Sequence, residues 1–169
     1  MTDLVITELV SQCILRMSEN TTKLTACLEE LNEDQIWLRP NDHSNSIGNL
    51  ILHLCGNITQ YIISSLGEAE DLRERDKEFT VRGGLNKQEL LYRLQETLAE
   101  AYSIMKRQNL QQLLKIRSVQ GFHYSGIGIL IHVTEHYSYH TGQMAFWTKI
   151  LKDKDLGFYA GIDLNQKNR

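Results

Sequence analysis

The chain has one proline, three cysteines and no long apolar run among its 169 residues. Because proline is the strongest breaker of helix interiors, its near absence leaves room for long uninterrupted helices. An odd number of cysteines without a CxxC pair fits reduced thiols better than a secreted disulfide framework. No apolar run reaches the roughly 18 residues of a membrane span, and no basic segment followed by an apolar one marks a signal peptide. We therefore expect a cytoplasmic protein with no membrane span.

Charge of one sign is also lacking. The 18 basic and 21 acidic residues are intermixed and give a formal net charge of −3. This balance provides no strong electrostatic footprint for nucleic acid or for an anionic membrane, so we expect neither as a partner. The length suits one domain that spans residues 1–169, long enough to bury a sizeable core without disulfides.

Apolar residues recur at helical spacing in four long segments, which predicts an all-α protein. The expected helices are Thr2 to Leu31, Ser46 (or Asn45) to Gly67, Asn86 to Gln108, and Ser125 to Lys152. Asn86 with Glu89 resembles a capping box, and Asn45 or Ser46 can cap the second helix. These elements predict a four-helix bundle.

The connections are long, which allows a crossover in place of a simple up-and-down order. We interpret the charged stretch Glu68 to Lys77 as a solvated loop rather than a binding patch. The spacing loosens between Asn109 and Tyr124, where LLKIRSV predicts an extended connector. Long loops in a compact bundle often build the rim of a site.

Three of the six histidines recur every fourth residue in the last helix, at His132, His136 and His140. Residues four apart lie one turn above each other on nearly the same helix face, so a pair can converge on one cation. His132 and His140 lie about 12 Å apart along the axis, so one ion cannot bind all three. A transition metal would use one adjacent pair and a third ligand from another segment.

His53, in the middle of the second helix within NLILHLCGN, is the candidate for that third ligand. Helix bundles build metal sites from side chains on facing helices, so His53, His136 and His140 can form a three-histidine site. The alternative is that each histidine is a hydrogen-bonded core residue in a metal-free bundle. Spacing alone does not choose between the pairs His132/His136 and His136/His140.

The segments SIGNLILHLCGN and HVTEHYSYHTGQMAFW resemble the two signature regions of the DinB-like superfamily, which includes YfiT-type putative metalloenzymes and bacillithiol transferases. The resemblance covers nearly the whole chain and implies a four-helix bundle. It implies His53, His136 and His140 as metal ligands, with HTGQ matching the ending of the family pattern, and leaves His132 as a non-ligand neighbour. The chain departs at Tyr139, where many relatives have a second histidine, and at Thr141, where arginine is common.

Three neutral histidines leave a divalent ion its full charge and an open position, which is typical of catalytic rather than structural sites. Such an ion can activate water for hydrolysis or bind a thiol as thiolate. Imidazole ligands suit Zn, Ni, Cu and Fe alike, and we expect Zn²⁺ or Ni²⁺. The resemblance implies the addition of a low-molecular-weight thiol to an electrophilic small molecule, and since family members are often dimeric we expect a homodimer. The hypothesis is therefore a metal-dependent thiol transferase or hydrolase, and the alternative is a non-catalytic metal-binding or stress-response interaction module.

Several neighbouring side chains have candidate roles in the site. Asn49, Asn57, Gln60 and Gln143 lie near the proposed ligands and can orient them or contact a substrate. Glu135 precedes His136 and points about 100° away from it on the helix, so we assign it no catalytic role. Cys55 lies about 200° around the helix from His53 and is expected to be a small core residue. Trp37 and Trp147 are expected to pack the bundle.

Overall fold

The computed structural model describes residues 2–168 and is mostly helical, which confirms the expected all-α class. Its elements follow the chain in this order: α1 (Thr2–Glu30), α2 (Glu33–Trp37), α3 (Ile47–Ile58), the π-helical segment η1 (Thr59–Leu66), α4 (Arg75–Thr80), α5 (Lys87–Lys106), α6 (Leu110–Leu114), β1 (Ile116–Val119), β2 (Phe122–Ser125) and α7 (Gly126–Lys152). In this part of the chain the only strands are β1 and β2.

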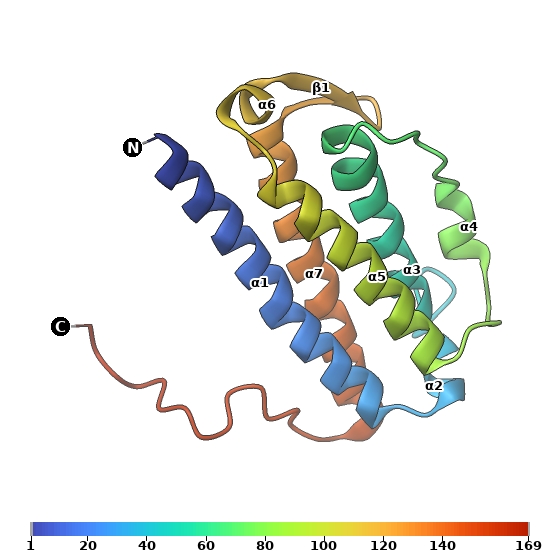
Figure 1. Cartoon of the computed structure of the whole chain (residues 1–169). Coiled ribbons are helices and arrows are strands. Elements are labelled where there is room, and N and C mark those ends of the chain that lie inside the picture. Colours follow the sequence, from blue (N-terminus) through green and yellow to red (C-terminus); the bar gives the residue numbers. More distant parts are fainter. Residues whose placement is uncertain (1, 169) are drawn as a thin grey trace.

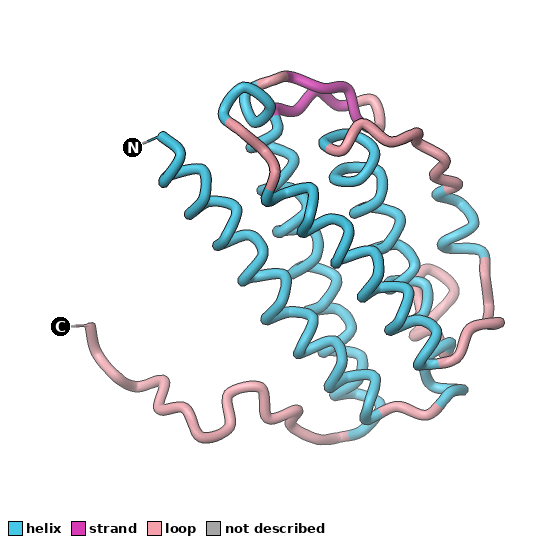
Figure 2. The backbone as a smooth tube through the Cα atoms, in the orientation of Figure 1, coloured by secondary structure: helices cyan, strands magenta, loops and turns pink. Residues whose placement is uncertain are grey.

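Four long elements form the bundle: α1, α3 with η1, α5 and α7 (Figures 1 and 2). Helix α7 packs on α1 and α3, and α5 packs on α3 and η1. Helices α3 and α5 run in the same direction, opposite to α1 and α7 (Figure 1). The chain between η1 and α5 must therefore cross the full length of the bundle, and it carries α4 on the way. This connection is the expected long crossover.

The helix starts agree with the caps expected from the sequence. The Ser46 side chain caps α3 by accepting from the backbone N–H of Asn49, and Asn86 with Glu89 forms a capping box at α5. Ser125 caps α7 by accepting from the Gly128 N–H. Each cap satisfies a backbone donor that the first helical turn leaves without a partner. The long helices therefore begin within a residue or two of their expected positions.

The apolar faces of the long helices meet in one core. Met17 and Leu24 from α1, Ile51 from α3, Leu94 from α5 and Ile129 from α7 are fully buried there. Burial of this apolar area, at about 25 cal/mol per Å², is the main force that holds the bundle together. Trp37 and Trp147 pack against the same core, as expected. Among the described residues no helix is long and apolar enough to cross a membrane.

The segment between Asn109 and Tyr124 differs from the simple extended connector that the sequence predicts. It contains the short helix α6 and then the antiparallel pair β1 and β2, in which Val119 pairs with Phe122. Gln120 and Gly121 form the turn with positive φ angles of 55° and 82°. Two central residues with positive φ give a turn whose twist matches that of the two strands. The hairpin lies at the end of the bundle where α7 begins (Figure 1).

The interpretation of Glu68 to Lys77 as a solvated loop is wrong for Arg73. Most of this stretch is exposed, and α4 begins within it at Arg75. The Arg73 side chain, however, is only 3% exposed and forms an ion pair with Glu78. A buried guanidinium needs such a partner, and that partner lies just beyond the stretch. The crossover is therefore anchored to the bundle by a buried charge pair.

Candidate metal centre

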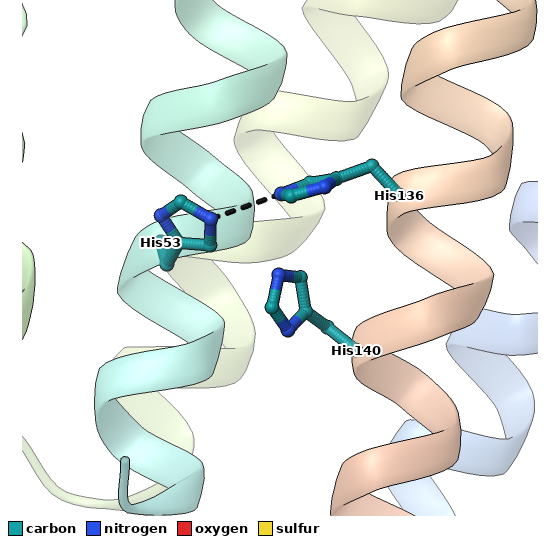
Figure 3. A group of neighbouring side chains, drawn as sticks. All are labelled: His53, His136 and His140. Atoms are coloured by element: carbon teal, nitrogen blue, oxygen red, sulfur yellow. Dashed lines mark hydrogen bonds between the residues drawn. The ribbon is translucent and has the colours of Figure 1, made fainter. Parts of the chain in front are cut away.

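The three histidines named from the sequence lie side by side between α3 and α7. His53 comes from the middle of α3, and His136 and His140 come from successive turns of α7. Their ligand atoms all lie within 4.8 Å of one another, and the Nε2 atoms of His53 and His136 are 2.9 Å apart. The rings point toward one another from the two helices (Figure 3). Among the described residues this is the group of histidine, cysteine and acidic side chains that could hold a metal ion.

Gln143 sets the orientation of the His140 ring. Its Oε1 lies 2.7 Å from His140 Nδ1, three residues earlier on the same helix. An amide oxygen only accepts, so Nδ1 carries the proton and Nε2 keeps a lone pair. The second nitrogen of His140 faces the other two rings in Figure 3. Gln143 thus has the orienting role considered for it from the sequence.

His53 is held from the other side by the crossover segment. Glu78 Oε2 lies 2.8 Å from His53 Nδ1, and the ring of Phe79 packs on the imidazole with a centroid separation of 4.7 Å. The carboxylate accepts the Nδ1 proton, so the Nε2 lone pair points at His136 and His140. An imidazole bound to a carboxylate in this way is the usual arrangement of a metal-ligating histidine.

Burial keeps two of the three imidazoles neutral. Burial, together with the smaller effects of the neighbouring His140 and His53 rings, lowers the pKa of His136 to about 3. Burial also lowers the pKa of His140 to about 4, against an opposing effect of the hydrogen bond that His140 Nδ1 donates to Gln143. At neutral pH both rings therefore present unprotonated nitrogens, which is the form that binds a metal.

The donor set fits a divalent transition metal. With bonds of about 2.0–2.1 Å, two nitrogens on one zinc ion lie at most about 4.2 Å apart. The His53 and His136 Nε2 atoms already meet this limit at 2.9 Å, and the whole set, within 4.8 Å, needs only a small inward shift. The lone pairs of two neutral imidazoles that face each other at about this distance repel unless a proton or a cation lies between them. The residues present thus fit a three-histidine site.

His132 is not part of this convergent group, although its ring stacks on that of His136 with centroids 5.4 Å apart. Its ring stacks on Tyr61, with centroids 4.4 Å apart, and its Nε2 lies 3.4 Å from the Asn57 amide nitrogen. Asn57 is one turn beyond His53 on α3, and His132 is one turn before His136 on the antiparallel α7. The structure therefore brings His53, His136 and His140 together and leaves His132 in an aromatic stack. Metal ligation by the three histidines stays a prediction.

Asn49 fixes the crossover to α3. This fully buried amide donates to the carbonyl oxygens of Glu78 and Val81 at 2.9 Å each, and its oxygen accepts from Arg39 at 2.9 Å. Arg39 also donates to the carbonyl oxygen of Phe79. The backbone on both sides of Glu78 is thereby held against the helix that carries His53.

Sequence reasoning missed Glu78 and Arg73, which lie 25 and 20 positions after His53. One signal could have indicated them. Gly56 follows His53 by three residues in an apolar helix, and an isolated glycine there marks a close approach of another group. A Cβ at this position would lie 1.9 Å from Glu78 Oε1. The glycine therefore leaves the space that the carboxylate occupies.

Cys55 lies on another face of α3 and is 3% exposed. Burial raises the pKa of its thiol to about 11, so it stays protonated at neutral pH. This is the behaviour expected of a core residue. A surface depression of about 550 Å³ lies along α7, lined by His132, Glu135, His136, Ser138 and Tyr139, so that one of the three grouped histidines, His136, borders it. It is large enough for a small molecule.

The helix arrangement, with its long crossover and its parallel pair of α3 and α5, is similar to that of a solved DinB-like protein. The structure resembles a crystal structure of the DinB-like protein YjoA from Bacillus subtilis, with a TM-score of 0.64 and 14% identity over 94% of this chain and 99% of that one. It also resembles a conserved protein from Enterococcus faecalis, with a TM-score of 0.66 and 15% identity over 89% and 97% of the two chains. These similarities confirm the fold expected from the sequence.

A comparison with models of protein families assigns the chain to one family. The model described as "Protein of unknown function (DUF1572)" matches residues 5–160, so the chain belongs to that family. No curated protein matches the chain.

The lowered histidine pKa values predict that the metal-free protein loses stability as the pH falls. Well above pH 6.5 the His136 and His140 rings are neutral in both the folded and unfolded states. Below it the unfolded chain binds protons that folded His136 and His140 do not bind until about pH 3 and pH 4. The free energy of unfolding therefore decreases over this window, by up to about 1.4 kcal/mol per pH unit for each ring.

Urea unfolding of chelator-treated protein at several pH values measures this effect. In His136→Gln the decrease between pH 6 and pH 5 should be smaller than in the unsubstituted chain by about 1 kcal/mol. The exposed His43→Gln serves as the control and should keep the full decrease. Equal decreases in all three proteins would contradict the prediction.

Proposed function

We propose that this protein binds one divalent transition metal, Zn²⁺ or Ni²⁺, through the Nε2 atoms of His53, His136 and His140. The observation that carries the proposal is the orientation of the rings. His53 Nδ1 is engaged by Glu78 and His140 Nδ1 by Gln143, so the remaining nitrogens of both rings face the centre of the group. A closed structural zinc site uses four protein ligands, whereas three leave a position for substrate.

We further propose that the site acts on a small molecule, as a thiol transferase or a hydrolase. A divalent ion held by three neutral imidazoles supplies a Lewis acid that lowers the pKa of a thiol or water. The depression lined by His136, Glu135 and Tyr139 provides access from solvent. The protein's own Cys55 is buried and protonated, so a transferred thiol would come from a second, low-molecular-weight molecule.

One observation favours a second candidate, a non-catalytic metal-binding module with the same bundle. The carboxylate closest to the histidines is Glu78, and Arg73 and His53 both occupy it. It is therefore unavailable as a general base. An enzyme would therefore have to transfer the proton of the activated thiol or water to the substrate, to solvent or to a more distant group. A metal-binding module would need no base.

Elemental analysis and a reaction panel separate the candidates. We expect about one metal per chain and turnover of an electrophile in the presence of a low-molecular-weight thiol, or of a hydrolysable ester. His140→Ala should lose at least about 100-fold of this turnover while its circular dichroism spectrum stays helical. His123→Ala, an exposed change in β2, is the matched control and should keep it. Bound metal without turnover on any panel member would support the non-catalytic module.

A further inference from the structure

The crossover segment reaches the histidine group through two buried charged side chains. Glu78 Oε2 lies 2.8 Å from His53 Nδ1, and Arg73 binds both oxygens of the carboxylate, through Nε at 2.7 Å and Nη2 at 2.9 Å. The side chains of His53, Glu78 and Arg73 are 7%, 10% and 3% exposed. A two-point guanidinium–carboxylate pair of this kind fixes the plane of the carboxylate as well as its position.

One face of α3 is shaped to receive this pair. His53, Gly56 and Gln60 follow at intervals of three and four residues, so they lie along one side of the helix and its π-helical extension. Gly56 leaves room for Glu78 Oε1, which would lie 1.9 Å from a Cβ. Gln60 Oε1 accepts from Arg73 Nη1 at 2.8 Å. The carboxylate and the guanidinium are thus both seated by the helix that carries the proposed ligand.

The hydrogen-bond directions are determined by these contacts. Arg73 Nη2 also approaches His53 Nδ1, at 3.2 Å. A guanidinium nitrogen only donates, so this contact alone would favour a lone pair on Nδ1, but the Glu78 carboxylate only accepts and lies closer, at 2.8 Å, which requires a proton on Nδ1. A neutral His53 therefore carries its proton on Nδ1 and has its lone pair on Nε2, the nitrogen 2.9 Å from His136 Nε2.

We propose that Glu78 and Arg73 are positioning residues for the metal centre, supplied by the crossover. Glu78 selects the Nδ1–H tautomer of His53 and fixes the ring so that Nε2 faces His136 and His140. Arg73 holds the carboxylate in place for this task. The proposal rests on the proposed metal binding, because its consequence is a higher affinity for the ion. Loss of an outer hydrogen-bond partner of this kind typically weakens metal binding about 10- to 100-fold.

Zinc affinity, measured by competition with a chromophoric chelator, tests the proposal. Glu78→Gln removes the charge and offers an amide that can also donate to Nδ1, so it should raise the zinc Kd at least about 10-fold. Gly56→Ala keeps both charged side chains but displaces them by its Cβ, and it should raise the Kd in the same direction. The matched control is Glu74→Gln, on an exposed carboxylate of the same segment, and its Kd should stay within about twofold.

Two further measurements exclude a merely structural effect. Nitrogen-15 NMR of the metal-free protein should show His53 protonated on Nδ1 in the unsubstituted chain and a mixture of tautomers in Glu78→Gln. Circular dichroism should show the same helix content in all variants. If Glu78→Gln fails to fold, Gly56→Ala still tests the proposal. Alanine favours the helix, and the atoms that its Cβ would meet are the ends of flexible side chains.

The outcomes separate this proposal from the proposed function. If the unsubstituted chain binds no zinc, nickel or other divalent ion, the proposed function fails. If it binds zinc and both Glu78→Gln and Gly56→Ala bind it equally well, metal binding stands and the positioning role is contradicted. A His53 Nε2–H tautomer in the metal-free protein would contradict the positioning role independently of any affinity.

Discussion

Replacement of His140 by alanine is expected to abolish stoichiometric metal binding, with a loss of affinity well above 100-fold. The change removes one of three converging nitrogens, and two ligands from His53 and His136 alone hold a divalent ion weakly. The loss should exceed the roughly 10- to 100-fold effect of removing an outer hydrogen-bond partner. Competition titration with Zn²⁺ and with Ni²⁺ measures it.

His132→Ala is the matched control for this prediction. It removes an imidazole from the same helix, eight residues earlier, where the ring stacks on Tyr61 and faces Asn57. The variant should keep its metal within a few-fold, because its ring is outside the converging group. Loss of metal in His132→Ala and retention in His140→Ala would show that the pair His132/His136 binds the ion.

Asn49→Ala is expected to lower the free energy of unfolding by about 3 to 5 kcal/mol. The fully buried Asn49 side chain bonds to Ser46, Arg39 and the carbonyl oxygens of Glu78 and Val81. Alanine leaves these buried groups without a partner, and each unsatisfied group costs about 1–3 kcal/mol. Because the same bonds hold the backbone around Glu78, zinc affinity should also fall.

Asn45→Ala is the corresponding control. This partly buried asparagine lies four residues earlier and has no side-chain hydrogen bond within the described residues 2–168. Urea unfolding should show a change below about 1 kcal/mol for it. Equal stability losses for the two variants would mean that Asn49 does not anchor the crossover.

The long helices were predictable because their signals are local. Leu90, Leu94 and Leu98 repeat at helical spacing in α5, and the caps Ser46, Asn86 and Ser125 lie next to the turns that they cap. The same holds for His53, whose place in an apolar helix is visible in the sequence. The hairpin of β1 and β2 was less visible, because each strand has only four residues.

The composition of the candidate metal centre was only partly predictable. Helix geometry limits the three histidines of α7 to one adjacent pair, but which pair faces His53 depends on how α3 and α7 are aligned, a property of tertiary packing. The family resemblance, not the spacing, selected His136 and His140. Arg73 lies in an irregular charged segment and Glu78 in the six-residue helix α4, which is too short for periodicity to indicate which side chains turn inward.

Gln143 and Asn49 form an intermediate case. Their spacing from the histidines made them candidates, and the structure assigns each a definite contact: Gln143 with His140, and Asn49 with the backbone beside Glu78. Sequence alone could not distinguish these roles from ordinary solvation, because a polar side chain one turn from a ligand can point along the helix or away from it. The single domain, the homodimer and the cytoplasmic location stay predictions.

A crystal structure of the protein grown with Zn²⁺, with anomalous diffraction collected on both sides of the zinc absorption edge, tests the central claim most directly. We predict one ion per chain, about 2.0–2.1 Å from the Nε2 atoms of His53, His136 and His140, with Glu78 still bonded to His53 Nδ1. An anomalous peak coordinated by His132, or no peak between α3 and α7 in a protein that retains its fold, would contradict it.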